Sequence, residues 1–339
     1  MAMEKEVKEF FGLLAVGIGT VIAVFYIVGF DKIFESVSEL NPYYYGIVVL
    51  LILSSIVLWA VRWGIFVRKI HPEVGWFDLL KMQFVGQAMN NLTPVFKMGG
   101  EAGKLYLLKR KYEIDVRESL ASISTDLTLE FIIDVILVLG AVSLLMILTS
   151  PPTWIYAILI GFVLVCFLIF FLIVEIYFGM KIMHNILGFL CRKIKRLNKY
   201  EKDIFERYES FRKNFKESLS DRKRFSQGLG LSFGRKGLTV AKFYVLLAAF
   251  GFNIGFANII IAMGLSIMLL MIPATPGNLG IYEGGMVSVL IFVGVSPGAA
   301  ATAVFLDRLV WFWGVSAVGG LIGSKYGLEI ISEHAAQKF

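Results

Sequence analysis

Residues 272–285 read IPATPGNLGIYEGG and interrupt an apolar stretch that covers residues 264–293. Proline cannot continue a helix and glycine weakens one, so Pro273, Pro276 and Gly277 predict two short helices around an irregular turn. Two helices in one such stretch are each too short to cross roughly 30 Å of hydrocarbon. We therefore predict a re-entrant hairpin, because non-helical backbone at membrane depth persists only where protein buries it or where it lines a wet cavity.

A second apolar stretch, residues 77–108, is interrupted in the same way by NNLTP at 90–94 and by GG at 99–100. It predicts another pair of short helices. The sequence thus indicates two re-entrant broken-helix hairpins, one in each half of the chain.

The rest of the chain is apolar enough for full membrane spans. Of 339 residues, 57% are hydrophobic and 17% are charged, and the mean hydropathy is +0.74, whereas soluble domains carry about 25% charged residues. Runs of roughly 20 apolar residues can cross a bilayer. Six such spans are predicted, at about 10–30, 43–67, 123–148, 153–178, 238–262 and 298–323. The predicted fold class is an all-α polytopic membrane protein, and the alternative to six spans with two hairpins is a set of eight plain spans.

Basic residues collect in residues 181–236, which hold sixteen Lys and Arg against six Asp and Glu. Cytoplasmic loops of membrane proteins carry such an excess of bases, so we predict that this segment is a cytoplasmic insertion. Apolar residues recur at helical spacing in its first part and predict an amphipathic helix along the membrane surface. The basic residues Arg62, Arg68 and Lys69 place the end of the second span on the cytoplasmic side as well. Both termini of this multi-pass protein of the cell (plasma) membrane are therefore expected in the cytoplasm.

The order of these elements repeats along the chain. Residues 1–148 read span, span, hairpin, span, and residues 149–339 give the same order around the basic insertion. The first hairpin is expected to enter from the cytoplasm and the second from outside. This pattern indicates an inverted repeat, an architecture associated with transporters whose substrate site lies where paired broken helices meet.

Polar residues gather at the interruption of the first hairpin. Helix N-termini bind anions, and two lysines near the start of the second half-helix favour a phosphate site there. The candidate residues are Asn90, Asn91, Thr93, Lys97, Gly99, Gly100, Glu101 and Lys104. The alternative is that Asn and Thr only cap the helices. The string GGEAGK is superficially like a P-loop, but Met98 and Leu105 occupy positions that require Gly and Ser or Thr, which excludes ATP binding.

The third span carries a row of acids. Asp126, Glu130 and Asp134 lie four residues apart and share one helical face. An ionisable side chain inside a membrane is costly and indicates a functional role by default. The alternative is that the acids pair with bases to hold the bundle together. The candidate bases are Arg62, Lys104 and Arg308.

The second hairpin and the last span hold the remaining candidates. The helix dipole favours a carboxylate at Glu283, near the start of a half-helix, where it would serve as a substrate or proton site. The other candidates are Pro276, Gly277, Gly280, Asp307 and Arg308. Asp307 and Arg308 are adjacent in sequence, so they point to different sides of a helix and each requires a partner elsewhere.

Other classes of protein find little support. The two cysteines and three histidines are far apart and have no partner at ligand spacing, so neither a metal nor another cofactor is predicted. The net charge of +7 follows from the bases on the cytoplasmic side, so nucleic-acid binding is not expected.

Several motifs together resemble a known family. The motifs are NNLTP with GGEAGKLYLLKR, TLEFIID at 128–134, PATPGNLGIYEGG, and FLDRLVWFW at 305–313. Together they are similar to the flippase-like membrane domain of the lysylphosphatidylglycerol synthase/flippase family and of the related UPF0104 proteins. The resemblance covers nearly the whole chain and implies that lipid head groups are moved between leaflets. In the synthases a soluble domain makes the aminoacylated lipid. This chain ends at Phe339 without one, so the expected lipid is an anionic phospholipid or a polyprenyl-phosphate-linked lipid.

The sequence leaves three functions open. The first is a lipid flippase, in which Lys97, Lys104 and Arg308 attract phosphate while Glu130, Asp134 and Glu283 contact a cationic group or carry protons. The second is a membrane-embedded head-group transferase with a carboxylate as general base. The third is a non-catalytic subunit of a lipid-synthesis enzyme. We expect a transporter rather than an enzyme, with membrane lipids as its partners and a homo-oligomer or a lipid-synthesis enzyme as a further possible partner.

Overall fold

The structure is a computed structural model that describes residues 41–92, 98–148, 153–193, 201–271 and 275–336, with four isolated positions before residue 41. The predicted span at 10–30 and two predicted site residues, Thr93 and Lys97, lie outside these continuous ranges. The described residues form helices and turns, with no strand among them. The predicted all-α membrane fold class is confirmed.

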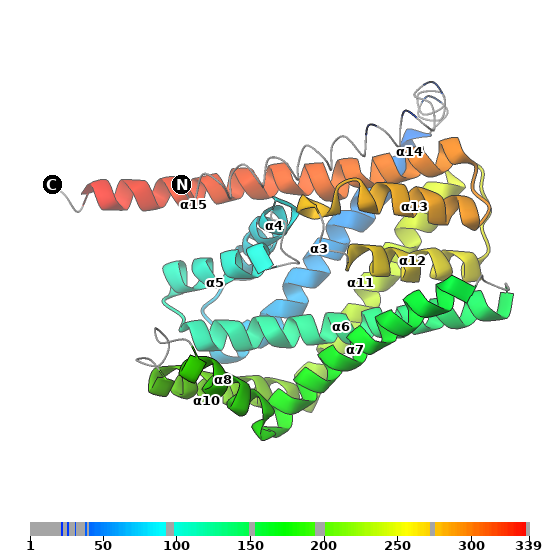
Figure 1. Cartoon of the computed structure of the whole chain (residues 1–339). Helices are drawn as coiled ribbons and strands as arrows, with labels where there is room; N and C mark the ends of the chain where they lie inside the picture. The colour runs from blue at the N-terminus through cyan, green and yellow to red at the C-terminus, as the bar shows by residue number, and fades with distance from the viewer. Residues whose placement is uncertain are drawn as a thin grey trace.

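Four of the described helices are long and apolar enough to cross a membrane. They are α3 (Pro42–Ile70), α6 (Val116–Leu148), α7 (Thr153–Phe178), and one rod made of α14 (Pro297–Arg308), η2 (Leu309–Gly314) and α15 (Val315–Ala336). They correspond to the predicted spans at 43–67, 123–148, 153–178 and 298–323. Figure 1 shows the long rod, and α7 running at an angle to α6.

The predicted span at 238–262 is wrong. A helix runs from Arg222 to Ala248 (α11), the chain turns at 249–255, and α12 runs from Phe256 to Leu270. The helix stops because Gly251 adopts a left-handed conformation with φ +75°. α11 carries Arg235 and Lys236 into the bundle, so these two bases belong to its interior rather than to the predicted cytoplasmic insertion. Of that insertion, the structure describes α8 (Lys181–Lys193) and α10 (Glu201–Ser220).

A break between two helices falls at each predicted interruption, but the first is narrower than predicted, because Asn90 and Asn91 lie in α4 and Gly99 and Gly100 lie in α5. The first separates α4 (Trp76–Leu92) from α5 (Met98–Tyr112), and these helices pack so closely that a Cβ on Gly100 would overlap the carbonyl oxygen of Gly86. The second separates α12 from α13 (Ile281–Phe292), with the single turn η1 (Pro276–Asn278) between them. With 17 residues at most, each of these helices is no longer than about 26 Å. That the two helix pairs re-enter a membrane stays a prediction.

The packing of the helices is reciprocal. α3 packs along α11, α12 packs on α6, and α4 packs on α15. By their order in the two halves of the chain, α3 corresponds to α11, α4 to α12, and α6 to α15. Exchanging the halves therefore leaves the α3–α11 pair unchanged and turns the α12–α6 pair into the α4–α15 pair. Such contacts are what a two-fold relation between the halves requires, although the repeat itself stays a prediction. The arrangement places the two interruptions beside each other.

Candidate functional site

A cavity of about 790 Å³ lies between the two hairpins and α3, α6 and α11. Its volume falls within the ~300–1,000 Å³ that is usual for small-molecule sites. Side chains of α6, α7 and α12 form an extensive apolar wall, with Phe131, Ile169 and Ile267 among them. The charged residues of the lining are Glu101, Glu130, Asp134, Arg235, Lys236, Lys242, Asp307 and Arg308. The cavity is therefore charged in one part and apolar in another.

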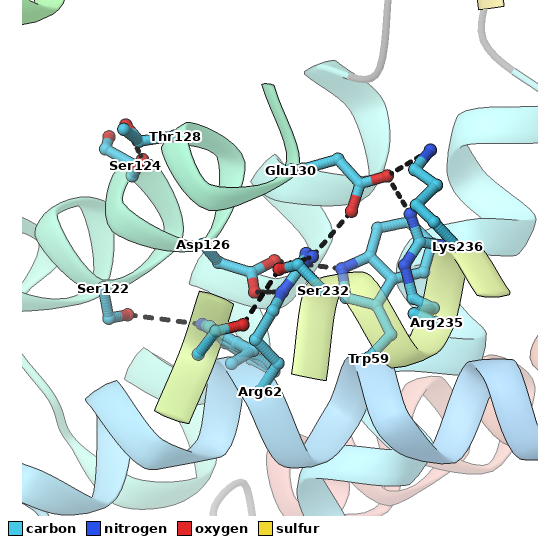
Figure 2. A network of polar contacts seen from close by, with 12 residues as sticks. Trp59, Arg62, Ser122, Ser124, Asp126, Thr128, Glu130, Ser232, Arg235 and Lys236 are labelled. Carbon is cyan, nitrogen blue, oxygen red and sulfur yellow. Dashed lines mark hydrogen bonds and ion pairs between the residues drawn. The ribbon is translucent and has the colours of Figure 1, made fainter. Parts of the chain in front are cut away.

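The acidic face of α6 meets Arg62 of α3 (Figure 2). Arg62 is fully buried, and its guanidinium donates from Nε to Asp126 Oδ1 and from Nη1 to Glu130 Oε2, each at 2.6 Å. The same Nη1 donates to the Ser232 hydroxyl at 2.9 Å, and the Trp59 indole donates to the second oxygen of Asp126 at 2.9 Å. A buried ion pair offsets its desolvation only when further hydrogen bonds satisfy its groups, and Asp126 meets this condition.

Two bases of α11 extend the network toward the cavity. Arg235 pairs with Glu130, and Lys236 Nζ lies 2.9 Å from Glu130 Oε1 and also pairs with Asp134. The Arg235 guanidinium stands 4.6 Å from the centre of the Trp59 ring, which adds a cation–π attraction. Three bases thus face three acids between α3, α6 and α11.

A second group of charges joins the second hairpin to α14. Glu283 Oε2 accepts from the Gly280 backbone N–H at 2.6 Å, while its Oε1 lies 2.7 Å from Arg308 Nε. Arg308 also donates to the carbonyl of Gly277 at 3.2 Å. Lys242 of α11 lies 2.5 Å from Asp307 Oδ1. Glu283 therefore caps its half-helix and anchors Arg308 at the same time.

The two hairpins touch at their interruptions. Asn91, at the end of α4, donates its side-chain amide to the Phe312 carbonyl at 3.3 Å and to the Ser316 hydroxyl at 2.9 Å. Gly277 has φ +58°, and a Cβ there would overlap the Phe312 ring. Phe312 belongs to η2, where the last helix widens into a π-helical turn. The first hairpin, the second hairpin and the last helix therefore meet at one point beside the cavity.

The polar residues of the first hairpin are largely occupied within it. Asn90 Oδ1 accepts from the Gly100 backbone N–H at 2.7 Å, so it caps α5 as the alternative interpretation of this residue proposed. Lys104 is 1% exposed, lies 3.1 Å from Glu101 Oε2, and stands 5.1 Å and 5.2 Å from the rings of Trp63 and Trp59. Lys104 is thus held by a carboxylate and two aromatic faces.

The predicted site residues fall into three groups. Those that line the cavity are Asn90, Asn91, Glu101, Glu130, Asp134, Gly277, Asp307 and Arg308. Asp126, Lys104 and Glu283 lie behind the lining as partners of other charges, and Pro276, Gly280, Gly99 and Gly100 are not in the lining. Thr93 and Lys97 lie outside the described residues.

Five residues of the site were not among the predicted site residues: Trp59, Ser232, Arg235, Lys236 and Lys242. Arg235 and Lys236 were both assigned to the basic insertion at 181–236. A signal was available, because Arg235 and Lys242 lie seven residues apart and so share one side of a helix. The acids of α6, four residues apart, likewise share one side of their helix. Hydropathy alone predicted that this helix starts at about residue 238 rather than at Arg222, because the basic residues lower the hydropathy of α11.

The charges in and around the cavity balance. Among the described residues the cations are Arg62, Lys104, Arg235, Lys236, Lys242 and Arg308, and the anions are Glu101, Asp126, Glu130, Asp134, Glu283 and Asp307. Each has a partner of opposite sign in this set. Within the ranges that the structure covers, no group of three or more His, Cys, Asp or Glu side chains is arranged to hold a metal ion.

The chain is similar to membrane proteins of archaea along most of its length. A UPF0104 membrane protein of Methanothermobacter thermautotrophicus is 28% identical over 312 residues, which cover 91% of this chain and 92% of that protein. A UPF0104 membrane protein of Pyrococcus horikoshii is 24% identical over 332 residues, which cover 94% of this chain and 98% of that protein. No solved structure matches. A family model described as the lysylphosphatidylglycerol synthase TM region matches residues 11–319, and the chain belongs to this family of multi-pass membrane proteins.

Proposed function

We propose that this protein is a lipid translocase that moves a charged or phosphate-bearing head group between leaflets through the cavity between the two hairpins. The observation that carries the proposal is the divided wall of the cavity, which has ionised side chains in one part and apolar side chains of α6, α7 and α12 in another. A lipid has the same division between head group and acyl chains. Membership of a family named for lysylphosphatidylglycerol synthase adds a link to lipid chemistry.

The paired charges suggest how a head group passes. An unpaired charge in a membrane interior costs several kcal/mol, so each ionised group in and around the cavity is matched within the protein. A phosphate can take the place of Asp307 beside Lys242, or of Glu283 beside Arg308. An amine can take the place of Lys236 beside Asp134. The displaced carboxylate then binds a proton or the cationic part of the head group, so that neither the lipid nor the protein is left with a bare charge. The movement runs downhill or with an ion gradient.

The test uses the full chain reconstituted in vesicles that carry a head-group-labelled phospholipid in both leaflets. Translocation is read from the fraction of label that an impermeant quencher reaches with time. We expect Glu283→Gln and Asp307→Asn to slow translocation by about tenfold, the effect of ~1.4 kcal/mol on a rate. Asp203→Asn is the matched control, because Asp203 pairs with Arg207 on α10 and is 50% exposed.

The outcome also separates the alternatives. If both cavity variants fold and translocate as the parent does, the translocase proposal is wrong and the role of a partner subunit is favoured. If the vesicles instead accumulate a lipid with a new head group, the protein is a head-group transferase.

The transported lipid is expected to be an anionic phospholipid or a polyprenyl-phosphate-linked lipid, since both present phosphate to Lys242 and Arg308. Mass spectrometry of lipids that co-purify with the parent and with Asp307→Asn identifies the class. The lipid that the variant loses is the candidate substrate. A lipid retained equally by both proteins is bound elsewhere.

A further inference from the structure

A second pocket, of about 350 Å³, lies at the turn between α7 and α8, and it shares no lining residue with the large cavity. Its lining residues are Gly179, Met180, Lys181, His184, Tyr208, Glu209 and Arg212. α7 is long and apolar enough to cross a membrane, and it ends at Phe178. The pocket therefore lies where a spanning helix ends.

The turn is built tightly around Arg212 of α10. Gly179 has φ +69°, and a Cβ on it would overlap the Arg212 guanidinium, so the guanidinium lies directly against the backbone of the turn. Glu175 is fully buried one turn earlier, and its Oε1 accepts from the Met183 backbone N–H at 2.9 Å. This hydrogen bond fixes the start of α8 relative to the end of α7. Arg212 is thus held in place by the fold.

The pocket offers donors that suit an anion. Arg212 donates from Nη1 to Glu209 Oε2 at 2.7 Å, but its Nε is buried and has no hydrogen-bond partner among the described residues. A guanidinium presents its donors in a planar fork that matches a phosphate. Burial, and then the charge of Glu175, raise the pKa of Tyr208 to about 12, so its hydroxyl keeps its proton and directs it to the Glu175 carboxylate. Glu209 is 51% exposed and balances Arg212 when the pocket is empty.

The outer surface of α8, on the side away from the pocket residue His184, carries apolar side chains. Ile182, Ile186, Phe189 and Leu190 are exposed by 39–59%, and their spacing places them along one helical stripe. Arg192 and Lys193 end the helix with two exposed bases. α8 begins only three residues after α7 ends, and an exposed apolar stripe with bases beside it is typical of helices in the membrane interface.

We propose that this turn binds the phosphate of an anionic phospholipid in the leaflet on the α8 side, with Lys181 and Arg212 as its ligands. The acyl chains lie along the apolar stripe of α8. This lipid is retained at the protein surface and is distinct from the lipid that passes through the large cavity. The site therefore stands whether or not the protein is a translocase.

The test measures lipid retention and thermal unfolding of the full chain in detergent. Phosphatidylglycerol is expected to raise the melting temperature and to be retained in native mass spectra, whereas phosphatidylcholine and inorganic phosphate are not. Arg212→Gln should lower the retention of phosphatidylglycerol by about fivefold, the effect of one base near an anionic surface. Arg207→Gln should leave it unchanged. The two arginines share α10 and each has an acid partner on it, but Arg207 is 61% exposed and outside the pocket.

Lys181→Ala provides a second variant, because Lys181 is exposed and its loss spares the packing around Gly179. It should also reduce phosphatidylglycerol retention. Equal losses in the Arg212 and Arg207 variants would show attraction by general surface charge and overturn the proposal. Equal effects of phosphatidylglycerol and phosphatidylcholine on the melting temperature would also overturn the proposal. A melting-temperature rise with inorganic phosphate alone would assign the pocket to a soluble phosphate and overturn the lipid site.

Discussion

The carbonyl oxygen of Asn91 lies so close to Gly277 that a Cβ on Gly277 would stand 2.7 Å from it. Asn91 lies in the last turn of the first helix of one hairpin, and Gly277 lies in the turn of the other hairpin. Both line the large cavity. The contact between the hairpins thus requires glycine at position 277, because any larger side chain would lack both space and a favourable backbone conformation there.

Replacing this glycine is therefore expected to loosen the contact between the hairpins. Gly277→Ala adds both left-handed strain, about 1–2 kcal/mol for a residue with a Cβ, and the overlap with Asn91 and Phe312. Gly251→Ala is the control, since Gly251 has φ +75° with nothing within 4 Å of the added Cβ. In thermal unfolding, the Gly277 variant should melt at a lower temperature than the Gly251 variant. Equal melting temperatures would show that the close contact adds nothing.

The buried pairs of Arg62 should contribute strongly to stability. Arg62→Gln leaves Asp126 without its ion-pair partner and removes one of the three basic partners of Glu130. Breaking a buried pair from one side costs about 3–5 kcal/mol. Arg117→Gln, which removes a pair between half-exposed side chains, should cost at most about 1 kcal/mol. Unfolding in detergent measures both values. Similar values for the two variants would mean that water reaches the Arg62 network.

Lys242 and Asp307 should be coupled in a double-mutant cycle. Asp307→Asn alone leaves the Lys242 ammonium buried without its carboxylate, and Lys242→Gln alone leaves the carboxylate. The double variant removes both charges, so it should be more stable than the sum of the single effects predicts, by about 0.5–3 kcal/mol. Additive unfolding free energies would indicate that the two side chains do not interact in solution.

Asp221 should stabilise the start of α11 in a pH-dependent way. Its side chain accepts from the Arg224 backbone N–H at 3.1 Å, and this bond, followed by that from the Arg224 guanidinium, lowers the pKa of Asp221. A lowered pKa means that the stabilisation is complete above the unfolded value near ~3.9 and is lost as the pH falls through the folded value. Asp221→Ala should cost about 1 kcal/mol at neutral pH, and the difference from the parent should shrink toward pH ~3. A difference that is constant with pH would exclude the ionised cap.

The orientation proposed for the basic insertion is tested by labelling. Lys202→Cys on exposed α10 should react with an impermeant thiol reagent only after the cells are opened, if the insertion is cytoplasmic. Cys166 and Cys191 are both buried and serve as the background. Labelling of intact cells would place the insertion, and the turn between α7 and α8, on the outer side.

The sequence predicted long, uniformly apolar helices well, because a span such as α7 needs no partner to be recognised. It missed the course of α11, because Arg235, Lys236 and Lys242 lower the hydropathy of a helix whose bases are matched only by acids on other helices. Which base meets which acid depends on packing, so periodicity gave the acidic face of α6 but not its partners.

The interruptions were also predictable, whereas the roles of their polar residues were not. Pro276 and Gly277 predict the second turn through their own backbone preferences, which do not depend on the packing around them. Asn90 fitted either an anion site or a helix cap, and only its 2.7 Å hydrogen bond with Gly100 distinguishes the two.

The balance of ionised groups around the cavity has an electrical consequence. Moving one elementary charge through the full membrane potential changes the free energy by about 2.3 kcal/mol per 100 mV. Because the six cations and six anions of the described residues cancel, a rearrangement that carries them together transfers almost no net gating charge. If the protein moves lipid as proposed and no ion is coupled to the movement, the voltage dependence should report the charge of the cargo alone. A zwitterionic lipid would then cross at a rate that does not depend on membrane potential, whereas the rate for an anionic lipid would depend on it.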